Sequence, residues 1–84
     1  MPVGSTIGRD VALALLETVA NRFLSGDEHV TIRNVMRSVA QARQSGASDN
    51  EVGRALWKAD ANTRSSQLPH AAALIRELIS QSSR

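Results

Sequence analysis

The sequence predicts an all-α fold, a compact bundle of four short helices that forms a single domain over residues 1–84. Two observations lead to this prediction. Apolar residues recur in four successive segments at the three- and four-residue spacing that places them on one face of a helix. Aromatic residues make up only 2% of the chain and alanine is abundant, and this composition favours helices over strands.

The first helix is expected over about residues 7–24, with Ser5 or Thr6 as its N-cap and Gly26 just after its end. Its apolar residues spread around more than half of its circumference, at Ala12, Leu13, Leu15, Leu16, Val19, Ala20, Phe23 and Leu24. Because a helix this apolar must be covered on several sides, we expect it at the centre of the bundle. We also expect a homodimer, in which a second copy covers the apolar surface that remains.

Three further helices are expected over about residues 32–44, 49–63 and 69–80. Thr31 is suited to cap the first of these. Ser48 followed by Glu51 three residues later fits the capping box, in which each residue binds the backbone N–H of the other. Pro69 suits the first turn of the last helix, where its missing N–H is not needed.

The two ends of the chain, residues 1–6 and 81–84, are expected to be frayed tails of the single domain. Within the bundle, the residues near the centre of each apolar face should be fully buried. These are Leu15, Val19, Phe23, Val39, Leu56 and Ile75.

The reactive residues argue against an enzyme. The chain has no cysteine, which excludes a disulfide framework and a thiolate nucleophile. His29 and His70 are its only histidines, and they lack the close spacing of a paired zinc-binding motif. No serine lies in a nucleophile elbow, and no glycine-rich phosphate loop is present. We therefore expect no catalytic residue, no metal and no cofactor.

The chain is also expected to be a cytoplasmic protein without a membrane segment. No stretch approaches the roughly 18 consecutive apolar residues of a membrane span. The first residues lack the charged start and apolar run of a signal peptide. The net charge of +2 is lower than is usual for a nucleic-acid-binding chain, which makes nucleic acid the less favoured partner.

Trp57 is the most informative side chain. It lies off the apolar stripe of the helix over residues 49–63 and is flanked by Arg54 and Lys58. An aromatic residue beside arginine is typical of the centre of a protein-binding surface. The alternative is that a neighbouring helix or the N-terminal tail covers Trp57, with the small Gly53 and Ala61 making room for it.

A second group of polar residues lies opposite the apolar stripe of the helix over residues 32–44. Arg33 and Arg37 are four residues apart on one face, and Gln41 continues the row. This helix contains no acidic residue to offset their repulsion. The row is therefore either a solvated face or a binding face for an acidic protein surface or for phosphates.

These features favour a small non-enzymatic protein–protein interaction module, acting as a regulator, inhibitor or adaptor that occupies the surface of a partner protein. The partner is expected to be another protein, with an acidic surface where it meets the arginines. The predicted partner-binding residues are Trp57, Arg54, Lys58, Arg33, Arg37 and Gln41.

The alternative is a DNA-binding regulator that uses the region from the second to the third helix. Residues 30–35 read VTIRNV, which resembles the opening of the DNA-binding headpiece of LacI-type repressors. Residues 46–48 (GAS), followed by Glu and Val at 51–52, resemble the turn that enters a recognition helix. In that family the first of these helices is short, whereas here about ten residues separate Val35 from Gly46. The resemblance implies a DNA partner and binding that falls steeply with salt.

Overall fold

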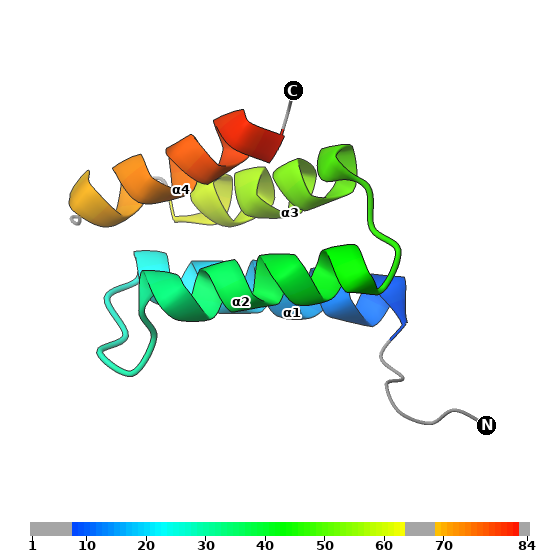
Figure 1. Cartoon of the computed structure of the whole chain (residues 1–84). Coiled ribbons are helices and arrows are strands. Elements are labelled where there is room, and N and C mark those ends of the chain that lie inside the picture. Colours follow the sequence, from blue (N-terminus) through cyan, green and yellow to red (C-terminus); the bar gives the residue numbers. More distant parts are fainter. Residues whose placement is uncertain (1–7, 64–68, 83–84) are drawn as a thin grey trace.

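The computed structural model describes residues 8–63 and 69–82, and over these residues the chain is all-α. Its helices are α1 (Arg9–Leu24), α2 (Ile32–Gln44), α3 (Asp49–Asn62) and α4 (Pro69–Ser82). Successive helices run antiparallel, and α1 lies beside α2 in one layer while α3 lies beside α4 in the other (Figure 1). The predicted four-helix bundle is confirmed.

Local signals set most of the helix ends. Thr31 and Ser48 are the N-caps of α2 and α3, as predicted. Asn34 strengthens the start of α2, because its Oδ1 accepts the Thr31 N–H at 2.8 Å. Gly26 and Gly46 follow the ends of α1 and α2 with φ of 88° and 100°, a conformation that glycine adopts without the steric penalty of a Cβ.

Two of the predicted helix ends, the start of α1 and the end of α4, are wrong. The N-cap of α1 is Gly8, in extended backbone, and not Ser5 or Thr6, which lie outside the described residues. The chain also does not fray at residue 81. The helix α4 continues to Ser82, which is only 3% exposed, because Ser82 is one turn beyond the partly buried Leu78 and Ile79 on the same face.

The core forms where α1 meets α2 and α3, and where α3 meets α4. The helix α1 contacts all three others, which confirms its central position, although α3 shares that role. The largest fully buried side chains are Leu16, Leu24, Val35, Val52, Leu56 and Ile75. Small alanines such as Ala12, Ala20 and Ala59 fill the spaces between them and let the helices approach closely.

The predicted core of α1 was partly wrong. Leu15 is 41% exposed, and Val19 and Phe23 are only partly buried, whereas Val39, Leu56 and Ile75 are buried as predicted. The reason is that α1 buries every fourth residue, from Ala12 to Leu24, along the groove formed by its neighbours. Its apolar face is wider than that groove, so Leu15 and the equally placed Val11 remain at the surface. The homodimer stays a prediction, and these are the side chains it would cover.

Candidate protein-interaction surfaces

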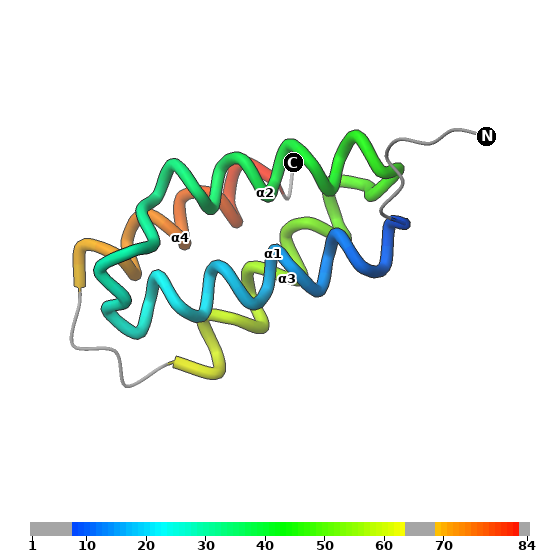
Figure 2. The backbone as a smooth tube through the Cα atoms, turned by 90° about the horizontal axis from the view of Figure 1, so that it is seen from below, coloured from blue at the N-terminus to red at the C-terminus, as the bar shows by residue number. Residues whose placement is uncertain are grey.

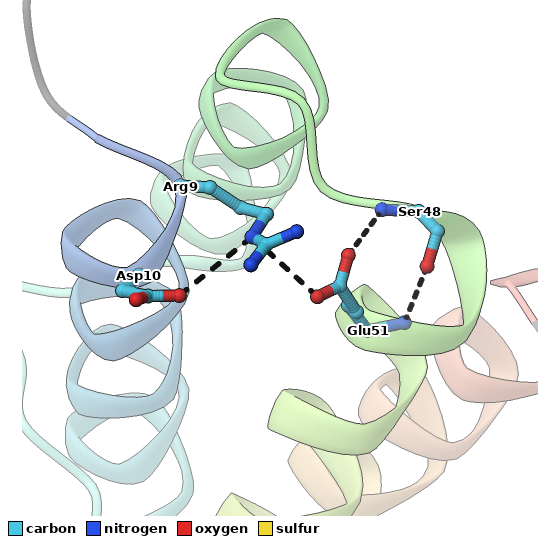
Figure 3. Close-up of polar contacts among 4 residues, drawn as sticks. All are labelled: Arg9, Asp10, Ser48 and Glu51. Carbon is cyan, nitrogen blue, oxygen red and sulfur yellow. Dashed lines mark hydrogen bonds and ion pairs between the residues drawn. The ribbon is translucent and has the colours of Figure 1, made fainter.

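A chain of polar contacts holds the start of α3 against α1 (Figure 3). The Ser48 N–H donates to Glu51 Oε1 at 2.9 Å, and the Glu51 N–H donates to Ser48 Oγ at 3.2 Å. Arg9 of α1 places its Nε 3.6 Å from Glu51 Oε2 and 3.6 Å from Asp10 Oδ1. The two hydrogen bonds confirm the predicted capping box. The Arg9–Glu51 ion pair links the start of α3 to the start of α1.

The same contacts lower the pKa of Glu51 below its ordinary value of 4.5. The largest cause is the backbone hydrogen bond from Ser48, which favours the charged carboxylate. Partial desolvation acts against it, while the positive charges of Arg9 and Arg54 act with it. The carboxylate form of Glu51 is therefore the form that the fold prefers.

Replacing Glu51 with Gln is expected to make stability less dependent on pH below about 4.5. Because the pKa of Glu51 is lower in the folded chain than in the unfolded chain, its contribution is fully present above that pH and is lost as pH falls through the folded pKa. Glutamine keeps an amide oxygen for the Ser48 N–H but carries no charge. Thermal unfolding followed by circular dichroism across this acid range measures the effect. The same loss of stability in both proteins would contradict the prediction.

Trp57 lies on the outer face of α3 and is 60% exposed. The helix turns Val52, Leu56 and Ala59 into the core, and Trp57 follows Leu56 by one residue, about 100° around the helix. Gly53, one turn before Trp57, is buried, but no neighbouring helix packs over the Trp57 ring in the space that the small Gly53 leaves. The alternative in which a neighbouring helix covers Trp57 is therefore wrong, whereas the N-terminal tail, the other cover considered, lies outside the described residues.

Arg54 and Lys58 are exposed beside Trp57 and line a groove of about 300 Å³ between α3 and α1. Asp10, Glu17 and Glu51 line the same groove, so its positive and negative side chains nearly balance. The two basic residues thus border a groove of mixed charge, and the exposed Trp57 ring remains the main apolar feature of this side of α3.

Two of the three arginines of α2, Arg33 and Arg37, differ from most arginines of the bundle. Arg33, Arg37 and Gln41 are exposed on the face of α2 that points away from the core. Over residues 8–63 and 69–82, Arg33 and Arg37 have no carboxylate within ion-pair distance. By contrast, a carboxylate oxygen lies within 3.6 Å of Arg9, Arg22, Arg43 and Arg76. The charges of Arg33 and Arg37 are therefore free for an external partner.

The six predicted residues do not form one surface. The helices α2 and α3 each pack closely against α1 but only slightly against each other, so they occupy diagonal corners of the bundle (Figures 1 and 2). Their outer faces consequently point to opposite sides. We call the first the tryptophan surface (Arg54, Trp57 and Lys58) and the second the arginine face (Arg33, Arg37 and Gln41).

Sequence reasoning missed two exposed apolar side chains. The spacing of apolar residues places Met36 on the apolar stripe of α2, yet it is 54% exposed, and Leu74 of α4 is 41% exposed. Around the helix, Met36 lies between the buried Val39 and the exposed Arg33, at the border of the stripe. Its position at the border of the stripe is the one sequence feature that could have indicated exposure, because a side chain there is buried only if a neighbouring helix packs against it.

Within the described parts of the chain, His, Asp and Glu side chains form no group of three that could hold a metal ion. His29 and His70 are both exposed. The backbone N–H of His29 donates to Asp27 Oδ1 at 2.9 Å, a contact that shapes the turn after α1. The helices over these same residues are too short or too polar to cross a lipid bilayer.

Comparisons of the chain with protein-family models, with curated proteins and with solved structures found no match. Its function is therefore argued from the two surfaces described above and from the physical chemistry of the residues on them.

Proposed function

We propose that this chain is a small, non-enzymatic interaction module of the cytoplasm, a regulator, inhibitor or adaptor that occupies the surface of another protein. The observation that carries this proposal is the 60% exposure of Trp57. Tryptophan is highly buried on average in folded chains. Transfer of its exposed apolar area from water into a partner's surface is favourable, and tryptophan is enriched among the residues that dominate binding energy.

Trp57 is well placed to anchor a partner protein, because contacts within the chain itself fix the position of α3. The helix packs against α1 on one side and α4 on the other, and the Ser48–Glu51 capping box holds its start. A side chain presented on such a helix loses less conformational entropy on binding than one on a mobile loop. Arg54 and Lys58 provide the charged rim that commonly surrounds an apolar anchor.

The proposal is tested by placing a photo-crosslinking amino acid at position 57 of the full chain in its native cells. We expect irradiation to join the chain to one or a few proteins of defined mass. The matched control carries the same amino acid at Ala14, an exposed position of α1. Adducts that are identical at positions 57 and 14, or no adducts at either position, would contradict an interaction surface centred on Trp57.

The alternative, a DNA-binding regulator that uses α2 and α3, has less support from the geometry. A helix-turn-helix unit crosses its two helices at about 90–120°. Here α2 and α3 run antiparallel at diagonal corners and pack only slightly against each other (Figure 2). The two functions differ in one measurement, because DNA binding weakens steeply with rising salt whereas binding anchored on Trp57 depends on salt weakly.

A further inference from the structure

A further surface, next to the arginine face, lies where α2 borders α4. Of the neighbouring helix pairs these two pack least closely, and the start of α4 lies beside the turn after α1. There a pocket of about 350 Å³ has apolar walls formed by Phe23, Val30, Ala71 and Leu74. Asp27 and His70 stand at its edge. The pocket is large enough for one or two apolar side chains of a partner.

Met36 extends this apolar region along α2. Ser45 lies with Val11 of α1 at the end of the bundle, so it marks the flank of α2 that faces α1. Met36 precedes Ser45 by nine residues, half a revolution around the helix, and therefore lies on the other flank, which faces α4. Met36 and Leu74 are thus large apolar side chains left exposed on facing flanks of two loosely packed helices.

Unpaired positive charge borders the same region. Arg33 and Arg37 lie next to Met36 on the exposed side of α2, and α2 contains no acidic residue. The acid at the pocket edge, Asp27, is already paired, because its Oδ2 lies 3.3 Å from Arg22 Nε. The α2 border of this surface is therefore both apolar and net positive.

We propose that this surface binds an acidic amphipathic segment of another protein. Apolar side chains of that segment enter the pocket beside Leu74 and rest on Met36, while its carboxylates pair with Arg33 and Arg37. We call it the α2–α4 surface (Phe23, Val30, Arg33, Met36, Arg37 and Leu74). It lies apart from the tryptophan surface, so a chain that uses both surfaces would bridge two proteins.

Two other occupants fit the residues less well. A nucleic acid would leave the apolar pocket unused, and binding that rests on phosphates uses more positive charges than Arg33 and Arg37 supply. A second copy of this chain carries a net charge of +2, so it brings no excess of carboxylates to pair with the arginines. An acidic partner with exposed apolar side chains satisfies both the pocket and the arginines.

The test is a selection of short peptides from a random display library on the immobilised full chain. We expect the enriched peptides to combine large apolar residues with Asp or Glu. The affinity of one such synthetic peptide should fall by roughly tenfold or more in the Arg33→Glu/Arg37→Glu double variant and in Leu74→Asp. The matched control is the Ala14→Glu/Thr18→Glu double variant, which also places two acidic residues four apart on an exposed helix face, and its affinity should stay within a factor of two or so of wild type.

Circular dichroism shows whether each variant is folded, and Leu74→Gln replaces Leu74→Asp if the latter is not. Three results would overturn the proposal. The first is the absence of enriched acidic peptides. The second is peptide binding that is insensitive to Arg33, Arg37 and Leu74. The third is occupation by something else, seen either as Arg37-dependent binding of a short DNA duplex that displaces the peptide, or as sedimentation showing a dimer that Leu74→Asp dissociates.

Discussion

Replacing Leu16 with alanine is expected to lower the free energy of unfolding by about 3–5 kcal/mol, whereas the same change at Leu15 should cost less than about 1 kcal/mol. Leu16 is completely buried among side chains of α1 and its neighbours, so its truncation removes apolar contacts and leaves a cavity. Leu15 is 41% exposed and has little packing to lose. The two substitutions delete the same atoms from adjacent residues of one helix.

Urea titration followed by circular dichroism measures both effects. A domain of this length has a total stability of roughly 4–13 kcal/mol, so Leu16→Ala removes a large part of it. The variant should show a lower urea midpoint, or should be unfolded without urea, while Leu15→Ala should unfold close to the wild type. Equal midpoints for the two variants would show that α1 is rotated relative to the arrangement described here.

Replacing Trp57 with alanine is expected to weaken binding to the protein crosslinked at that position by roughly thirtyfold or more, the loss typical of a residue at the centre of an interface. Folding stability should change by no more than about 0.5 kcal/mol, since Trp57 is largely exposed and contributes little to the core. The strong effect on binding and the small effect on stability together distinguish a binding residue from a structural one.

Trp57 is the only tryptophan of the chain, so its fluorescence reports on this surface directly. The free protein should emit at the long wavelength of a solvated indole, and addition of the partner should shift the emission to shorter wavelength. Arg37→Glu is the control, because Arg37 lies on the opposite side of the bundle and should leave this titration unchanged. A partner that binds without shifting the emission would contradict contact with Trp57.

The helices themselves could be predicted because their signals are local. Ser48 and Glu51 cap α3 through bonds between residues three apart, and Gly26 ends α1 because its positive φ suits that residue. The three- and four-residue spacing of apolar side chains identified all four helices for the same reason. The start of α1 was mispredicted because Gly8 offers no side-chain signal, and the end of α4 because Ser82 is a polar residue that the fold buries.

The candidate sites depended on information that lies outside any one helix. The sequence identified Trp57 as lying off the stripe of α3, but whether a neighbouring helix covered it depended on how α3 and α4 pack. The spacing of Arg33 and Arg37 placed them on one face, but their lack of carboxylate partners depended on where the acids of other helices lie. The spacing places Met36 on the apolar stripe of α2, but it cannot show whether α4 approaches α2 closely enough to bury that side chain.

By itself, then, the sequence determined four amphipathic helices, most of their ends and the composition of each face, since these follow from bonds and spacings within a few residues. The tertiary structure decided which part of the wide apolar face of α1 is buried, that Trp57 stays exposed, and that the six predicted residues divide between opposite sides of the bundle. The physical reason is that burial and surface continuity depend on the distance between helices, and that distance is set by how their side chains pack together.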